Sequence, residues 1–309
     1  MNTGRKSNVE RTMTTLHRVI ITALLLASVG AVTSPAFAQD APVYWDRARG
    51  ELSVGTGAPT QDSMISAINS GSGTQLFSVL EYGERVECRT CVPLLEAKLL
   101  SSDDSRVREI AAWWLRRRIF ASGAVMVHMK TVLATDTDAV QRSRAAEAIG
   151  EFMDINGLAA LATSVVSDVD PRVREASVVA IARINAPRGN DLLTMALADT
   201  DVTVRRAAVS AVLRVNFFRS YDALVPLLAD PDALVRRSAA RAVGELRVAG
   251  AEATLAALLR GDTDRLVRQS AAWALGRIGS GAARTALAEA TGESDSLVRD
   301  AIEIARLMR

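Results

Sequence analysis

The chain repeats one short pattern at a nearly constant interval. The stretches "DTDVTVRRAAVSAVLRV" (199–215), "DPDALVRRSAARAVGEL" (230–246) and "DTDRLVRQSAAWALGRI" (262–278) place charged, small and apolar residues at the same spacing. In seven copies an Asp is followed four residues later by an Arg, and successive arginines lie 34, 32, 31, 31, 32 and 31 residues apart. Such a period is the signature of a repeat protein, in which each unit packs on its neighbours.

Each Asp stands just before a stretch whose apolar residues share one face of a helix, so we expect it to be the N-cap of that helix. In the fifth copy this face consists of Val235, Ala239, Ala242, Val243 and Leu246. Stacked repeats would align the Asp and Arg residues into a ladder along the molecule. The seven predicted ladder pairs are Asp104/Arg108, Asp138/Arg142, Asp170/Arg174, Asp201/Arg205, Asp232/Arg236, Asp264/Arg268 and Asp295/Arg299.

Shorter apolar runs lie between these helices and predict a preceding helix in each repeat. The runs are "AVMVHMKTVLA", "GLAALATSVVS", "NDLLTMALA", "YDALVPLLA", "AEATLAALLR" and "ARTALAEA". One helix pair cannot bury its apolar face alone, but stacked pairs can. The sequence therefore predicts an all-α fold, an α-solenoid (superhelix) of about seven two-helix repeats.

The copies resemble HEAT repeats, in particular the short type known from phycobilisome lyase subunits. The resemblance rests on the Asp/Arg pairs, on dipeptides such as Val173-Arg174 and on helix ends such as Ala242-Val243-Gly244 and Ala274-Leu275-Gly276. It covers residues 88–309 and implies a solenoid whose second helices line the concave side. It implies little about activity, because folds of this kind serve many unrelated functions.

The first 38 residues have the pattern of a secretory signal peptide. A basic leader precedes an apolar run of 14 residues, Val19 to Val32, and the small-x-small pattern Ala36-Phe37-Ala38 follows. We expect cleavage after Ala38 and export, to the periplasm in a bacterium, with no membrane span afterwards. An uncleaved membrane anchor and a start at Met13 are the alternatives.

The remaining chain divides into three parts. Residues 39–60 are polar and rich in Gly and Pro, which predicts a flexible lead-in, and residues 61–87 predict a helical N-terminal cap. Tyr44 and Trp45 of the lead-in could pack on the solenoid or on a partner. Residues 88–309 form the predicted HEAT-like solenoid. Its last repeat, residues 295–309, replaces apolar positions with Glu303 and Arg306, as a capping repeat needs for solubility.

Cys88 and Cys91 are the two cysteines, in a Cys-x-x-Cys arrangement. In an oxidising compartment we expect a structural disulfide. A thiol-redox role remains open because Cys91 precedes an apolar run that could be a helix. Metal binding also remains open, although the exported chain keeps one histidine, His128, and deoxyhypusine hydroxylases of this repeat type use His-Glu pairs that this chain lacks. We expect no cofactor and no metal.

The charge balance argues against a nucleic-acid partner. The whole chain has a formal net charge of +2, and removal of residues 1–38 leaves 33 basic and 34 acidic residues. Proteins that bind nucleic acid usually carry a strong positive excess.

Two columns of variable residues on the second helices predict a binding surface. They lie five and nine residues after the Arg of each pair, where a regular helix would place them on one face. Trp and Arg dominate binding hot spots. The predicted partner-binding residues are Trp113, Arg117, Arg183, Arg214, Arg241, Trp273 and Arg277. Packing of Trp113 or Trp273 against the adjoining repeat is the alternative.

These features predict an exported, non-catalytic scaffold that binds a protein or peptide through the concave face. No nucleophile, phosphate-binding or metal motif is evident, so an enzyme is the less favoured interpretation. The alternative is an enzyme or enzyme subunit, either thiol-redox through Cys88 and Cys91 or lyase-like.

Overall fold

A computed structural model describes residues 45–46, 51–52 and 59–308, and the chain divides into two units, Met1–Pro59 and Thr60–Arg309. In the first unit, strands β1 (Trp45–Asp46) and β2 (Glu51–Leu52) pair antiparallel, with Trp45 opposite Leu52. Both strands lie within residues 39–60, the predicted flexible lead-in. The predicted signal peptide, its cleavage site after Ala38 and Tyr44 lie outside the described residues.

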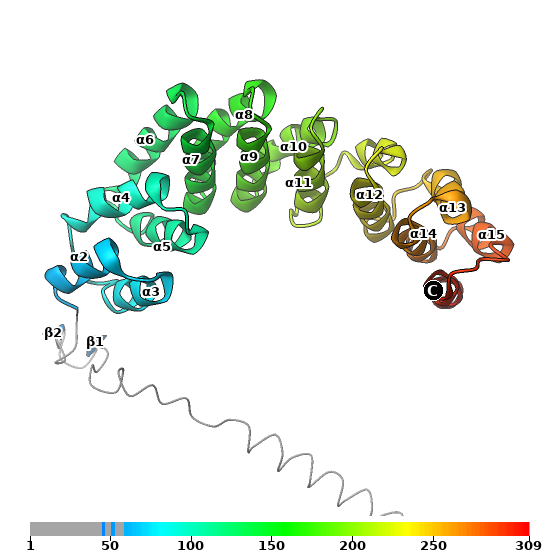
Figure 1. Ribbon diagram of the computed structural model, residues 1–309, viewed down its shortest axis with the longest axis horizontal. Coiled ribbons are helices and arrows are strands. Elements are labelled where there is room, and N and C mark those ends of the chain that lie inside the picture. The colour runs from blue at the N-terminus through cyan, green and yellow to red at the C-terminus, as the bar shows by residue number, and fades with distance from the viewer. Residues whose placement is uncertain (1–44, 47–50, 53–58, 309) are drawn as a thin grey trace, which may run out of the picture. The chain divides into compact units, whose positions relative to one another are not determined.

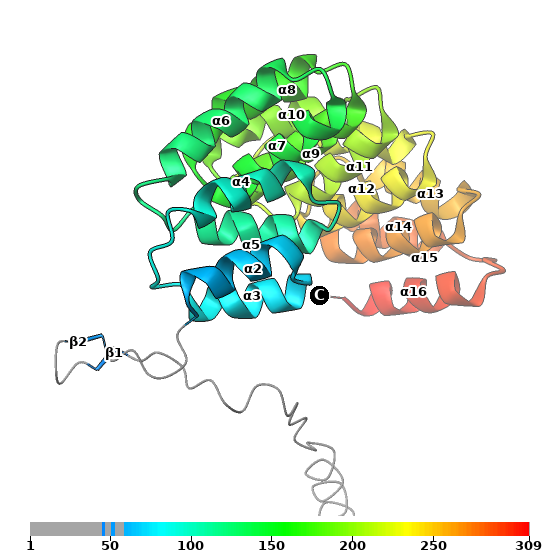
Figure 2. The same cartoon turned by 60° about the vertical axis from the view of Figure 1, so that its left-hand side comes forward.

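The second unit is a curved stack of helix pairs (Figure 1). The first helices form its outer layer, and the second helices form its inner, concave layer (Figures 1 and 2). The outer layer contains α2 (Gln61–Ser70), α4 (Cys91–Ser101), α6 (Ser122–Thr135), α8 (Leu158–Ser167), α10 (Asn190–Leu197), α13 (Glu252–Gly261) and α15 (Gly281–Glu289). The inner layer contains α3 (Gly73–Tyr82), α5 (Ser105–Leu115), α7 (Ala139–Phe152), α9 (Pro171–Ile184), α11 (Val202–Val212), α12 (Ala233–Glu245), α14 (Arg265–Ile278) and α16 (Ser296–Leu307).

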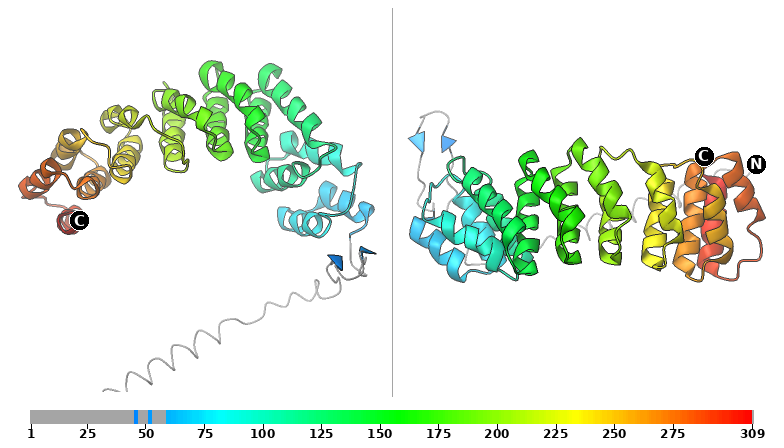
Figure 3. Two further views of the ribbon diagram at one scale, coloured as in Figure 1. Left: turned by 180° about the vertical axis from the view of Figure 1, so that it is seen from behind. Right: turned by 90° about the horizontal axis from the view of Figure 1, so that it is seen from above.

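The predicted solenoid of two-helix repeats is therefore confirmed. Successive inner helices contact one another along the stack, and Figure 3 shows from behind the arc that they follow. Single-turn 3₁₀ helices η1 (Ile155–Gly157) and η2 (Pro187–Gly189) lead into α8 and α10. The pair α2 and α3, which lacks the Asp/Arg pattern, extends the stack beyond the seven predicted copies.

One predicted helix was wrong. The run "YDALVPLLA" forms two 3₁₀ helices, η3 (Tyr221–Leu224) and η4 (Pro226–Ala229), instead of one α-helix. Pro226 has no N–H to donate to the carbonyl four residues before it, and its ring would clash with that carbonyl in an α-helix. The tighter hydrogen bonds from the N–H of Val225 to Asp222 and from that of Leu228 to Val225 replace the α-helical ones.

The core runs continuously from α2 to α16 between the two layers. The stripe predicted on α12 lies in it, because Val235, Ala239, Ala242 and Val243 are fully buried, while Leu246 is half-buried. Burial of small side chains at these positions brings neighbouring inner helices close together.

Glycines at one repeated position set the closest approaches. A Cβ on Gly150, Gly244 or Gly276 would lie 2.6–2.8 Å from the Cα of an alanine on the next inner helix: Ala180, Ala274 or Ala305. Separations under about 3 Å are not tolerated by real side chains. The "Ala-x-Gly" helix ends are therefore needed for packing between repeats rather than for ending the helix.

The Asp of every predicted pair is an N-cap. Each of the seven carboxylates accepts a hydrogen bond from a backbone N–H of the first turn, at distances such as 2.8 Å for Asp201 Oδ1 to Thr203 N. The Arg four residues later does not pair with this Asp, so the pairing within the predicted ladder needs correction. The Asp carboxylate faces the helix N-terminus, where it is already satisfied by N–H groups.

The Arg instead reaches an acid in the turn between the two helices of the next repeat, two residues before the capping Asp of that repeat. Arg205 Nε and Nη2 donate to both carboxylate oxygens of Asp230, at 2.6 and 3.0 Å, and its Nη1 donates to the carbonyls of Asp199 and Thr200. The same two-pronged contact recurs as Arg142–Asp168, Arg174–Asp199, Arg236–Asp262 and Arg268–Glu293.

We call these five contacts the inter-repeat ladder. Each acid also accepts the N–H of the capping residue two positions later, as Asp230 does from Asp232 at 2.9 Å. The side chains are mostly buried, with 13% exposure for Arg205 and 6% for Asp230. One charge-assisted contact thus connects the turn of one repeat to the helix start of the next. The same contact stabilises the stacking of the two repeats.

The two ends of the solenoid depart from this pattern. Arg108 pairs with Glu147 of α7, at 2.8 Å, rather than with Asp136. At the other end Arg299, in the last described helix, has no acid partner among residues 59–308 and donates to the carbonyls of Glu293 and Ser294.

Arg306 of the last helix also has a structural role. Its guanidinium donates two hydrogen bonds to the carbonyl of Leu287, at 2.7 and 3.1 Å. It thereby supplies a partner for a carbonyl in the last turn of α15, which has no acceptor role within the helix.

Ionisation of the ladder acids is favoured in the folded protein. The hydrogen bond from Arg236 holds the pKa of the Asp262 carboxyl below its usual value, although burial opposes this. For Asp230, burial favours the neutral acid, but the hydrogen bonds from Arg205 and from the Asp232 N–H outweigh it and lower the pKa. The pKa of Asp168, Asp199 and Glu293 is lowered in the same way.

The glycine contacts predict that Gly244→Ala destabilises the protein by about 1–3 kcal/mol, because the added Cβ would collide with the backbone of Ala274. Gly261→Ala, at the end of α13, meets nothing within 4 Å and is the matched control. Urea melts measure both free energies of unfolding. Equal effects of the two substitutions would contradict the packing role.

The ladder predicts unequal costs for two equivalent arginines. Arg205→Ala leaves the buried Asp230 carboxylate without its cation and should lower the free energy of unfolding by about 2–3 kcal/mol. This figure already allows for the residual solvation of the carboxylate. Arg299→Ala loses only hydrogen bonds to carbonyls and should cost about 0.5–1 kcal/mol. Urea melts of the two variants provide the comparison, and a cost at Arg299 that matches the cost at Arg205 would rule out the ladder as an inter-repeat clamp.

The lowered pKa values predict an acid-sensitive fold. An acid with a lowered folded pKa contributes stability that is fully present above its unfolded pKa, about 4, and is lost as the pH falls through the folded pKa. The free energy of unfolding should therefore change little from about pH 7 to 5 and fall below about pH 4. The fall should be shallower in Arg236→Ala, and an unchanged slope in that variant would show that the ladder does not cause it.

Candidate concave binding surface

The seven predicted partner-binding residues all lie on the inner helices or just beyond their ends, but they do not form one continuous surface. Two of the arginines have partners within the chain. Arg117 Nε lies 3.0 Å from Glu84 Oε1, and Arg183 pairs with Glu151 of α7. These two guanidinium groups are therefore partly neutralised by intramolecular acids.

Trp113 packs against the adjoining repeat. Its ring lies 5.9 Å from that of Phe77 on α3, and the Arg117 guanidinium lies 4.4 Å from the Trp113 ring centroid. The indole is half-buried against the core. Trp113 thus contributes mainly to the joint between α3 and α5, as the packing alternative expected.

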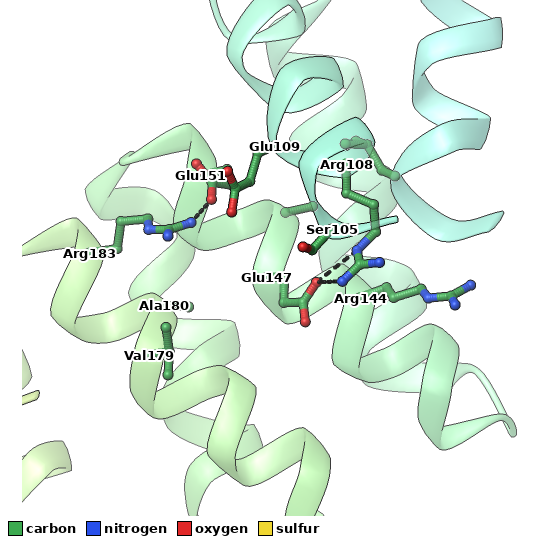
Figure 4. A pocket seen from close by; sticks show the side chains of 11 residues that line it. Ser105, Arg108, Glu109, Arg144, Glu147, Glu151, Val179, Ala180 and Arg183 are labelled. Atoms are coloured by element: carbon green, nitrogen blue, oxygen red, sulfur yellow. Dashed lines mark hydrogen bonds and ion pairs between the residues drawn. The ribbon is translucent and has the colours of Figure 1, made fainter. Parts of the chain in front are cut away.

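A small charged pocket follows on the same face, between α5, α7 and α9 (Figure 4). It has a volume of about 160 Å³, and its walls carry paired charges. Glu147 receives Arg108, and Glu151 receives Arg183, so two of its acids are used within the protein (Figure 4). The third acid of the lining, Glu109, is exposed and has no ion-pair partner among residues 59–308.

A larger hollow lies on the concave side across α12, α14 and α16, and we call it the C-terminal groove. Its volume is about 470 Å³. It is lined by Leu234, Arg237, Ser238, Arg241, Gln269, Ser270, Trp273, Leu297, Asp300, Ala301 and Ile304.

Trp273 both packs and lines this groove. A Cβ on Gly244 would lie 2.9 Å from Cζ3 of Trp273, so the indole rests on the close approach between α12 and α14. Its remaining surface faces the groove. Three aliphatic side chains around it are exposed, namely Leu234 at 49%, Leu297 at 45% and Ile304 at 58%.

The groove also contains cations that no acid neutralises. Arg237 and Arg241 are exposed, and neither has an ion-pair partner among residues 59–308. They stand four residues apart on one helix, where like charges destabilise the helix by about 0.2–0.5 kcal/mol. Asp300 is the one acidic residue in the groove lining.

The two remaining predicted arginines lie near the ends of inner helices. Arg277 lies 5.8 Å from the Trp273 ring centroid, and its Nε is buried without a hydrogen-bond partner. Arg214 follows α11, is exposed and has no ion pair within the described part of the chain.

Sequence reasoning missed Leu234, Arg237 and Leu297, because it examined only the columns five and nine residues after each anchor Arg. The groove also uses positions two before, one after and two after that Arg. A signal was present in the sequence: a large apolar residue stands two positions after the capping Asp, outside the buried stripe, at Leu234 and at Leu297.

Cys88 and Cys91 are joined in the structure by a disulfide at the start of α4, whose first residue is Cys91. Both residues have no exposed surface. The N–H of Cys91 donates to Cys88 Sγ at 3.2 Å. A buried disulfide is poorly accessible to an attacking thiolate, which favours a structural role.

Two further features bear on chemistry. Within the described residues no group of three or more His, Cys, Asp and Glu side chains is arranged to hold a metal ion. In the same part of the chain, no helix is both long and apolar enough to cross a membrane.

The chain is similar to several solved structures. The Escherichia coli protein YibA matches with a TM-score of 0.53 and 19% identity over 80% of this chain and 93% of its own. The complex of CpcE and CpcF of phycocyanin lyase from Nostoc matches with a TM-score of 0.39 and 25% identity, covering 69% and 85%. Human deoxyhypusine hydroxylase matches with a TM-score of 0.34 and 22% identity, covering 79% and 94%. The first likeness supports the fold alone.

Family comparison is more specific than these structural likenesses. No curated protein sequence matches the chain. The family model described as HEAT repeats matches residues 126–214 and 221–305, which together are more than half of the 309 residues. These residues include α7 to α15 and most of α16, with their capping Asp residues and the inter-repeat ladder. The chain belongs to the HEAT-repeat family.

Proposed function

We propose that this protein is an exported, non-catalytic scaffold that binds another protein through its concave face. The observation that carries the proposal is the C-terminal groove. It combines exposed aliphatic side chains, an indole and two exposed arginines without an ion-pair partner among residues 59–308, whereas the arginines of the inter-repeat ladder are paired. Partly exposed Trp and Arg side chains in a concave site are typical of interaction hot spots.

Export is part of this proposal and rests on the leader of residues 1–38, whose apolar run precedes Ala36-Phe37-Ala38. We assign the exported protein to the periplasm, if its source is a bacterium. The net charge of −1 in residues 39–309 supports a protein rather than a nucleic-acid partner.

A thiol-redox enzyme is the alternative function, and the burial of both cysteines weighs against it. A redox-active Cys-x-x-Cys pair needs one sulfur that a substrate thiol can reach. A lyase-like subunit has no further support, because the likeness to phycocyanin lyase concerns the repeat alone.

Affinity capture from the periplasmic extract, followed by mass spectrometry, should recover a protein partner on wild-type protein that begins at Gln39. Trp273→Ala should weaken this capture by about 1.5–3 kcal/mol, roughly tenfold or more in affinity. The variant also removes packing on Gly244, so its urea melt is measured in parallel. Affinities are then compared per folded molecule.

Arg260→Glu, on the outer helix α13, is the matched control because Arg260 is exposed and lies outside the groove. It should leave capture unchanged. Capture by folded Trp273→Ala that equals wild-type capture would contradict binding at this part of the concave face.

A further inference from the structure

The C-terminal groove uses the same helix positions in successive repeats. Residues one, two and five after the anchor Arg line it on α12, α14 and α16. The position two after the Arg holds Ser238, Ser270 and Ala301, whose small side chains leave the hollow open. Because equivalent positions line up from helix to helix, the groove runs across the helices, along the direction of the stack.

This direction sets the size of the ligand. Neighbouring helices pack about 8–10 Å apart, so a ligand that spans three of them is about 20 Å long. An extended chain advances about 3.3 Å per residue and covers this distance in about six residues. The volume of about 470 Å³ suits two or three side chains rather than a helix about 10–12 Å across.

The charges along the groove are unequal at its two ends. The α12 end carries Arg237 and Arg241, neither with an acid partner among residues 59–308, and the α16 end carries Asp300. Trp273, on α14, provides apolar surface between the two charged ends, and Ile304 provides apolar surface on α16 beside Asp300. A ligand that completes this site supplies an acid over α12 and a large apolar side chain on Trp273.

We propose that the C-terminal groove binds an extended segment of a partner protein in which an acidic residue stands close to a large apolar residue. This proposal rests on the proposed function and specifies the ligand of the same surface. The acid is placed over Arg237 and Arg241, where it neutralises two cations that otherwise repel each other on one helix. The apolar side chain covers the open part of the Trp273 indole and the exposed aliphatic groups around it.

Selection of random eight-residue peptides displayed on phage, against the purified protein, tests the ligand class. Enriched sequences should carry Asp or Glu within three residues of Phe, Trp, Leu or Ile. The most enriched peptide is then synthesised, and its Kd is measured by fluorescence anisotropy. Arg241→Glu should weaken this Kd at least tenfold, and added salt should weaken it further.

A charge swap separates direct contact from a structural effect. The same peptide with its acid changed to lysine should bind wild-type protein poorly and regain affinity for Arg241→Glu. Arg260→Glu on α13 should leave the affinity for the original peptide within twofold of wild type.

Three results would overturn the proposed ligand: no enrichment, enriched peptides without an acid, or equal affinity of Arg241→Glu and Arg260→Glu for an acidic peptide. Loss of partner capture in folded Trp273→Ala would still support the concave scaffold in each case. The two proposals therefore fail separately.

Discussion

The contact between an arginine of one repeat and an acid in the turn of the next repeat holds this solenoid in register. Each such arginine donates to a backbone carbonyl of its own turn and to both carboxylate oxygens of the acid in the next repeat. Arg236, for example, donates to the backbone carbonyl of Asp230 and to the carboxylate of Asp262. That acid in turn accepts the N–H of Asp264, which caps the following helix. Local helix formation and stacking between repeats therefore depend on the same few atoms, and neither is complete without the next repeat.

Apolar packing adds a second constraint on the same helices. Gly150, Gly244 and Gly276 allow inner helices to approach until a Cβ would meet the neighbouring backbone. The corresponding positions on α9 and α11 hold Ala182 and Leu213, and contacts between the inner helices are less extensive there. The C-terminal groove lies on the tightly packed α12–α14–α16 part, where Trp273 rests on Gly244 and is held in place by the backbone beneath it.

The architecture could be predicted from the sequence because the period, the helical stripe and the capping Asp residues are local patterns. The partner of each ladder arginine could not be predicted, because the "Asp-x-Asp" spacing at 199–201 or 230–232 does not show which of the two acids faces the preceding repeat. Glu147 illustrates the limit. It replaces Asp136 as the partner of Arg108 because of where its side chain lies on α7, and this depends on the packing of two helices. Pro226 does predict an interrupted helix, but the apolar run around it favoured a continuous one.

The candidate site was predicted in part. Trp273 and Arg241 were found from their columns, and both line the groove. Trp113 was found in the same way, yet it packs on Phe77, because the neighbouring inner helix supplies an aromatic ring there. Whether a column residue packs or remains open depends on the adjoining repeat, and a single repeat pattern does not contain that information.

The central functional claim is that the concave surface over α12, α14 and α16 contacts the partner. Site-specific photo-crosslinking tests it most directly, with a photoreactive side chain placed at Gln269 in the groove or at Ala257 on the outer helix α13. The account predicts that the captured partner crosslinks from position 269 and not from position 257. Crosslinking from position 257 alone would show that the partner binds the convex side and would contradict the account.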